Sequence, residues 1–157
     1  HRAGRGLMHG PPHITVGLAT GLAVAAATGT RGPVQIAACA GIAGIAALAP
    51  DWMQINLPGV NRSIKGLTGH RGISHWVWSP LALSYLARSA LNAPDWLLIA
   101  FLCGWLSHII LDAFSNGVPA FWPWRLSLAK IKTGGRTDRL VGGAALVVSI
   151  ALTVSML

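Results

Sequence analysis

Residues 96–114 read WLLIAFLCGWLSHIILDAF, a largely apolar run of 19 residues that is interrupted near its end by His108 and Asp112. A helix needs about 20 mostly apolar residues to cross the hydrocarbon core of a bilayer, so the run predicts a transmembrane helix. Ionisable residues inside such a span are expensive to bury and usually serve a function. His108 and Asp112 are therefore candidate functional residues.

Four further apolar segments flank this run and predict four more helices. Ser79-Pro80 leaves two interpretations of the segment that ends at Leu91: a helix that starts there and is too short to cross, or a longer helix capped by Ser74 and kinked at Pro80. Small residues, as in GLATG at 17–21, favour close helix packing in lipid. The four segments are 14–30, 34–49, 75–91 and 140–157.

The composition supports a membrane protein. Of the 157 residues, 53% are hydrophobic and 10% are charged, against about a quarter charged in a typical soluble domain. We expect an all-α, polytopic bundle of about five spans, forming one membrane-embedded domain over residues 8–157. Met8 is a candidate native start, which would make residues 1–7 an extension or remnant. Cys39 and Cys103 lie inside apolar runs and are interpreted as buried structural thiols.

The net charge of +8 comes from 12 Lys and Arg against four Asp. Ten of the basic residues fall on one side of a five-span topology, and Arg31 and Arg88 fall on the other. The positive-inside rule then predicts a multi-pass inner-membrane protein with a cytoplasmic N-terminus, whose basic loops face anionic membrane lipids. No specific nucleic-acid motif is present.

Most His and Asp residues map to the cytoplasmic end of this topology. His108 and Asp112 share one helix face, about 5–6 Å apart at Cβ. Imidazole and carboxylate groups are ligands for zinc, which predicts one or more zinc ions here. Each residue also has a simpler interpretation: a structural hydrogen bond for HxxxD, a helix stop for Asp51, an N-cap for Asp138 and a solvated loop histidine for His70. The candidate metal ligands are His13, Asp51, His75, His108 and Asp112, with Asp138 as a further candidate.

The order of these motifs resembles the YdjM-like family of membrane-bound proteins, which are regarded as metal-dependent hydrolases from their motif. The matching elements are His13, PD at 50–51, HRGISH at 70–75, HIILD at 108–112 and GVPAFWPW at 117–124. This chain has Trp52 and Met53 where the family has a second acid after PD, and Trp76 where it has a hydroxyl residue. A looser resemblance to the zinc-dependent phospholipase C and single-strand nuclease superfamily implies a phosphoester substrate.

These observations favour a zinc-dependent hydrolase that acts on a phosphoester or lipid-like substrate at the cytoplasmic membrane interface. Arg71 would bind an anionic group, and His70 would be a ligand or transfer a proton. A non-catalytic adaptor with a structural metal or His–Asp network is an alternative, and a metal-free histidine lipid phosphatase is another. Metal transport is disfavoured because the spans offer few polar residues at mid-membrane. Oligomeric state is left open.

Overall fold

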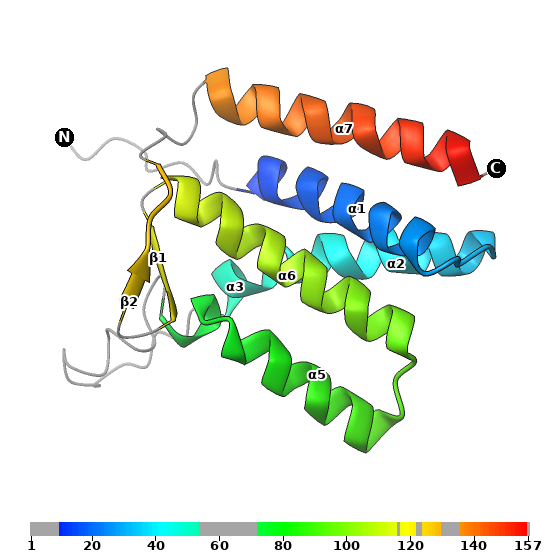
Figure 1. Ribbon diagram of the computed structural model, residues 1–157, viewed down its shortest axis with the longest axis horizontal. Coiled ribbons are helices and arrows are strands. Elements are labelled where there is room, and N and C mark those ends of the chain that lie inside the picture. The colour runs from blue at the N-terminus through cyan, green and yellow to red at the C-terminus, as the bar shows by residue number, and fades with distance from the viewer. Residues whose placement is uncertain (1–9, 54–71, 116, 122–123, 130–135, 157) are drawn as a thin grey trace.

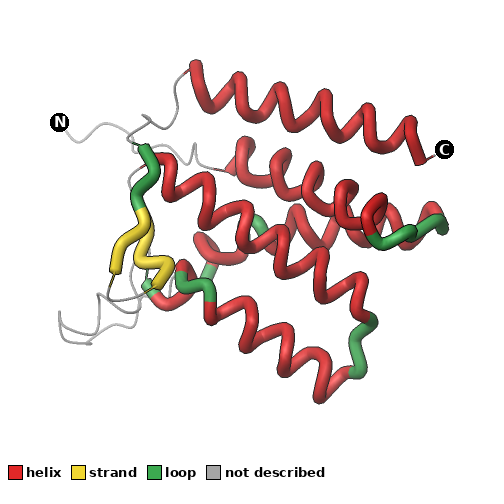
Figure 2. The backbone as a smooth tube through the Cα atoms, in the orientation of Figure 1, coloured by secondary structure: helices red, strands yellow, loops and turns green. Residues whose placement is uncertain are grey.

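The computed structural model describes residues 10–53, 72–115, 117–121, 124–129 and 136–156, which form mainly helices (Figures 1 and 2). In chain order these are α1 (Gly10–Ala27), α2 (Pro33–Ala46), α3 (Ala49–Trp52), the 3₁₀ turn η1 (Ile73–His75), α5 (Trp78–Leu91), α6 (Asp95–Ser115), the strands β1 (Val118–Phe121) and β2 (Trp124–Leu126), and α7 (Arg136–Met156). The expected all-helical class holds, apart from one short hairpin.

Each of the five predicted apolar segments overlaps one helix of at least 14 residues. The 21-residue α6 covers the run 96–114, and it is the described helix that is both long and apolar enough to cross a membrane. The apolar parts of α1, α2 and α7 are shorter. For the third segment the structure agrees with the interpretation of a short helix that starts close to Ser79-Pro80. Helix α5 starts at Trp78 and has 14 residues. Pro80 therefore lies in its first turn, where a missing N–H costs no helical bond.

The core of the bundle is made by α1, α2 and α6, which pack against one another, while α5 covers α6 and α7 packs on α1 (Figure 1). Glycines allow the three central helices to approach closely. A Cβ at Gly104 of α6 would lie 2.6 Å from the Cα of Ala43 in α2, and one at Gly17 of α1 would lie 2.6 Å from Ala47 Cβ. The small-residue positions in the sequence thus mark true helix contacts.

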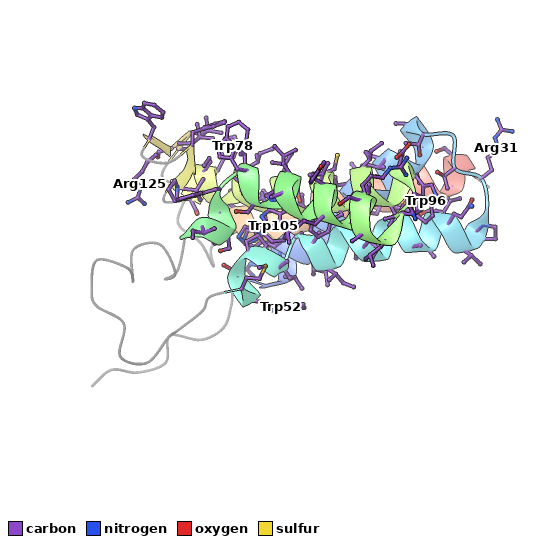
Figure 3. The ribbon with its side chains drawn as sticks, turned by 90° about the horizontal axis from the view of Figure 1, so that it is seen from below. Arg31, Trp52, Trp78, Trp96, Trp105 and Arg125 are labelled. Atoms are coloured by element: carbon purple, nitrogen blue, oxygen red, sulfur yellow. The ribbon has the colours of Figure 1, made fainter. Side chains whose placement is uncertain are left out.

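The helix ends gather on two sides of the molecule. The start of α1, α3, the end of α6, the hairpin and the start of α7 lie at one end, on the left of Figure 1. The α1–α2 and α5–α6 connections lie at the other end, with the end of α7. Arg31, in the α1–α2 connection, and Trp96, in the first turn of α6, mark this second end in Figure 3. The bundle therefore delivers the segments that carry His13, Asp51, His75 and Asp112 to one end.

The hairpin was not expected from the sequence. Strands β1 and β2 pair antiparallel, with Val118 opposite Leu126 and Phe121 opposite Trp124. The chain turns into β1 at Gly117, whose φ of +73° suits glycine. Backbone bonds join the hairpin to α6, from Gly117 N–H to Asp112 O at 3.2 Å and from Leu128 N–H to Ala113 O at 2.9 Å. The hairpin is thus fixed to the last turns of α6.

We expect Gly104→Ala to destabilise the bundle, because the added methyl group would overlap the backbone of Ala43. Overpacking of this kind lowers the free energy of unfolding by about 1–3 kcal/mol. Thermal unfolding of the purified protein in detergent would measure the loss. Gly41→Ala is the matched control, since nothing lies within 4 Å of its added Cβ. An equal response of the two variants would contradict the close contact at Gly104.

Candidate metal centre

Five predicted ligand side chains come together at the end of the bundle, delivered by four segments. His13 lies in the first turn of α1, Asp51 in α3, His75 at the end of η1, and His108 and Asp112 in the last turns of α6. His75 and His108 are both 0% exposed, whereas the side chain of Asp51 is 24% exposed. The cluster is therefore enclosed by protein around both imidazoles and is most open at Asp51.

Asp51, His75 and His108 form a group of donors that could hold a metal ion, with all three donor atoms within 4.8 Å of one another. The two Nε2 atoms of His75 and His108 are 3.2 Å apart. Oδ1 of Asp51 lies 3.8 Å from the first and 3.7 Å from the second. The two rings meet edge to face, with centroids 5.1 Å apart.

Asp112 supplies a second carboxylate beside this group. Its Oδ2 lies 3.5 Å from His75 Nε2 and 3.9 Å from His108 Nε2. Its other oxygen, Oδ1, is 3.7 Å from Nε2 of His13. The His13 ring also stacks on His108, with centroids 4.2 Å apart. His13 therefore borders the group through Asp112 and His108 and lies outside the three-residue set.

The far nitrogens of the two imidazoles have partners that direct Nε2 toward the carboxylates. Nδ1 of His108 donates to the carbonyl oxygen of Ala47 at 2.7 Å, and a carbonyl only accepts. In the neutral ring, Nε2 of His108 therefore carries a lone pair. Nδ1 of His75 lies 3.1 Å from the hydroxyl of Ser74. Metal-bound histidines usually have such outer partners, which fix the tautomer and the orientation of the ring.

The donor set fits a zinc ion. With bonds of about 2.0–2.1 Å in a tetrahedron, two ligand atoms of one zinc lie roughly 3.3–3.4 Å apart. The three separations within the group, 3.2, 3.7 and 3.8 Å, differ from this by a few tenths of an ångström. The Nε2 lone pair of His108, with Nε2 of His75 facing it and carboxylates beside both, also makes a site that favours a cation. Asp51, His75 and His108 could thus hold the metal, with Asp112 adjacent.

Trp105 is a part of this centre that the sequence analysis did not single out. Its indole N–H donates to the carbonyl of Ser74 at 2.9 Å, and its side chain is fully buried. It thereby ties η1, which carries His75, to the turn of α6 that precedes His108. The sequence does distinguish Trp105 by its position. Six of the seven tryptophans lie near the ends of apolar segments or in connectors, whereas Trp105 lies inside the apolar run 96–114.

The structure does not describe the side chains of the other candidate site residues. His70 and Arg71 lie outside the described residues. Asp138 is in the first turn of α7, at the same end as the cluster, but its side chain is not among those described. Asp95 begins α6 at the opposite end and pairs with Arg88 at 3.3 Å. Cys39 and Cys103 are free thiols; Cys39 is buried, as expected, and Cys103 is half-buried.

The sequence matches the family described as YdjM inner membrane protein over residues 8–156. The chain belongs to the YdjM inner membrane protein family. This confirms the resemblance drawn from His13, the PD element, HRGISH, HIILD and the FWPW segment, and it identifies the chain as a membrane protein. Neither the search of curated proteins nor that of solved structures found a match.

This YdjM-family chain lacks the second acid after PD that the resemblance led us to expect. Trp52 follows Asp51 in α3, and its side chain is exposed rather than directed into the cluster. The second carboxylate beside the histidines is that of Asp112, in the HIILD element on α6. The loss of an acid after PD therefore leaves two carboxylates, from different helices, near His75 and His108.

We expect Trp105→Phe to weaken zinc binding while keeping the fold, because it removes the indole N–H that holds Ser74 and retains an aromatic ring in the core. Loss of an outer partner usually lowers metal affinity roughly 10- to 100-fold. Competition with a chromophoric chelator would measure the affinity, and the visible spectrum of bound Co²⁺ would report the ligand geometry. Trp96→Phe, at the other end of α6, is the matched control. Equal affinity and an unchanged Co²⁺ spectrum would contradict the role of Trp105.

Proposed function

We propose that this YdjM-family protein is a zinc-dependent hydrolase of phosphoesters, acting on a lipid-like substrate at the cytoplasmic face of the inner membrane. The observation that carries the proposal is the three-donor group of Asp51, His75 and His108 with Asp112 beside it. Closed structural zinc sites usually have four protein ligands, whereas catalytic sites have three and an open position. Among the side chains that the structure describes, three form the donor group, a number that corresponds to the catalytic pattern.

The choice of zinc follows from the donors. Two imidazole nitrogens and a carboxylate oxygen are a known ligand set for catalytic zinc, whereas magnesium and calcium prefer oxygen ligands. A bound zinc ion would supply Lewis-acid chemistry, polarising a phosphoryl oxygen and acidifying nearby water. Asp51, His75 and His108 would hold that ion, with the Ala47 carbonyl and Ser74 orienting the two imidazoles.

The other residues have distinct roles in this proposal. Oδ2 of Asp112 lies beside both histidine Nε2 atoms, close enough to accept a proton from a group that binds there. His13 contacts the opposite oxygen of Asp112 and orients the carboxylate. Arg71, which the sequence places next to His70 in HRGISH, would bind the anionic phosphoryl group through its planar guanidinium.

The geometry of the cluster also bears on the two alternative functions, a metal-free histidine phosphatase and a non-catalytic adaptor. A metal-free phosphatase needs a histidine whose ring can reach the phosphorus atom, and His75 and His108 are both fully buried. This disfavours His75 and His108 as nucleophiles. A non-catalytic adaptor is favoured by one observation: the cluster joins α1, α3, η1 and α6, so a metal there would also stabilise the bundle. A structural role predicts zinc binding without any turnover.

The proposed topology has five spans, formed around α1, α2, α5, α6 and α7, with the N-terminus in the cytoplasm. It is supported by the ten-to-two distribution of basic residues and by the apolar character of α1, α2 and α7 besides α6. The short α2 and α5, with 14 residues each, would span through flanking residues or local thinning of the bilayer. This orientation places the candidate metal centre on the cytoplasmic side.

The proposed chemistry is tested by zinc content and hydrolysis together. We expect Asp51→Ala and His108→Ala each to lose zinc and to lower hydrolysis of a phosphoester by roughly 100-fold or more, because the ion contributes several kcal/mol to such reactions. Zinc would be measured by elemental analysis, and hydrolysis on a panel of phospholipids and soluble phosphodiesters. Asp95→Asn is the control, since Asp95 lies at the opposite end. Full zinc occupancy in the double variant Asp51→Ala/His108→Ala would exclude the site, and zinc without any turnover would favour the adaptor.

The topology is tested by reporter fusions. We expect fusions after Arg31 and after Leu157 to report a non-cytoplasmic location, because an odd number of spans separates both positions from the basic side. Alkaline phosphatase and a cytoplasmic fluorescent protein would give opposite signals at each site. A cytoplasmic location of Leu157 would show an even number of spans, with the 14-residue α5 the first helix to reassign.

A further inference from the structure

The β1–β2 hairpin carries aromatic side chains that are exposed in the part of the chain that the structure describes. Phe121 and Trp124 face each other across the hairpin and are 47% and 74% exposed. Trp78 joins them, because the N–H of the adjacent Val77 donates to Ala120 of β1 at 3.1 Å; it is 61% exposed. We call Trp78, Phe121 and Trp124 the hairpin patch. In contrast, Val118 and Ala120 of β1 are buried in the core.

The length of α6 places this patch at a defined depth. A helix of 21 residues is about 31 Å long, which matches the hydrocarbon core of about 30 Å. The first strand begins at Val118, just after α6 ends at Ser115. If α6 crosses the bilayer, the hairpin therefore lies at the boundary between hydrocarbon and headgroups. Tryptophan prefers this boundary, where its ring is in an apolar medium and its N–H meets water.

The charges around the patch suit an anionic lipid surface. Arg125 follows Trp124 directly, and Arg136 and Arg139 at the start of α7 are exposed at the same end of the molecule. Figure 3 shows Trp78 and Arg125 together at that end. Among the side chains that the structure describes, the two carboxylates at this end, Asp51 and Asp112, belong to the cluster and neither is fully exposed. Basic residues near an anionic membrane surface are attracted to it electrostatically.

The hairpin is also bonded to the segments that carry candidate ligands. Gly117 N–H donates to the carbonyl of Asp112, and Leu128 N–H donates to that of Ala113, the residue after Asp112. On its other side, Ala120 accepts from Val77, two residues after His75. The same short hairpin thus connects the aromatic patch to both the α6 and the η1 sides of the cluster.

We propose that the hairpin patch docks in the headgroup layer of an anionic bilayer and presents the cluster behind it to phosphoesters held in that layer. The docking rests on the exposed aromatics, the adjacent arginines and the length of α6. The choice of a membrane-borne substrate rests on the proposed hydrolase function. The two parts therefore need measurements that can fail separately.

The docking is tested by the depth of a spin label. A nitroxide would be attached at Trp124→Cys, in a background with Cys39→Ala and Cys103→Ala, and the protein placed in phosphatidylcholine vesicles containing phosphatidylglycerol. Power saturation with oxygen and with a water-soluble nickel chelate gives the depth. Labels at Ile99→Cys in α6 and at Arg31→Cys in the α1–α2 connection serve as apolar and aqueous references. We expect the label at 124 to lie between the two, and water exposure equal to that at Arg31 would overturn the docking.

The substrate class is tested by paired assays of the variant Phe121→Ala/Trp124→Ala. We expect its zinc content to equal that of the wild type, its hydrolysis of a phospholipid in vesicles to fall roughly tenfold, which corresponds to about 1.4 kcal/mol, and its hydrolysis of a water-soluble short-chain phosphoester to stay unchanged. An equal loss on both substrates would overturn the membrane-borne substrate. If the wild type hydrolyses neither, the proposed function is wrong, and the depth measurement still decides the docking.

Discussion

The hydrogen bond from His108 Nδ1 to the carbonyl of Ala47 is the contact on which the cluster depends. It requires a helix end on one side, because Ala47 is the C-cap of α2 and its carbonyl has no donor within that helix. It requires close packing on the other, because α6 must approach α2 until Gly104 meets the backbone of Ala43. One buried bond thereby links helix packing, the tautomer of His108 and the direction of its Nε2.

The rest of the cluster follows from this orientation. Nε2 of His108 faces His75 at 3.2 Å, so the non-helical segment with His75 must be held against α6. Trp105 holds it through Ser74, one turn before His108. The chain turns into α3 directly after Ala47, which brings Asp51 to the same two nitrogens. The short segments α3 and η1 thus obtain their positions from α6 rather than from helical stability of their own.

The sequence predicted the helices and the gathering of His and Asp well, because both follow from simple periodicity and topology. An apolar run of 19 residues with HxxxD at its end places His108 and Asp112 on one face of α6 whatever surrounds them. The prediction that Asp51 and His75 would lie near His108 followed from the alternating direction of the predicted helices. The sequence could not show that His13 would contact Asp112 and stack on His108 instead of joining the three-donor group, since that depends on distances within the packed bundle.

The hairpin and Trp105 were missed for a different reason. Strands of four and three residues with two prolines nearby have little intrinsic preference for a sheet, and their pairing is stabilised by bonds to α6 and to Val77. Similarly, an indole N–H bound to a distant carbonyl leaves no trace in hydropathy. His70 and Arg71, which the HRGISH motif indicates as functional, stay predictions because they lie outside the described residues.

The order of the ligands along the chain has a consequence for biosynthesis. All three residues of the donor group precede residue 109, and α7, which packs on α1, supplies none of them. Since membrane helices emerge from the ribosome in sequence order, the cluster can assemble as soon as α6 has packed on α1 and α2. The proposed metal site would therefore be complete before the last helix has been synthesised, and α7 would pack on α1 afterwards.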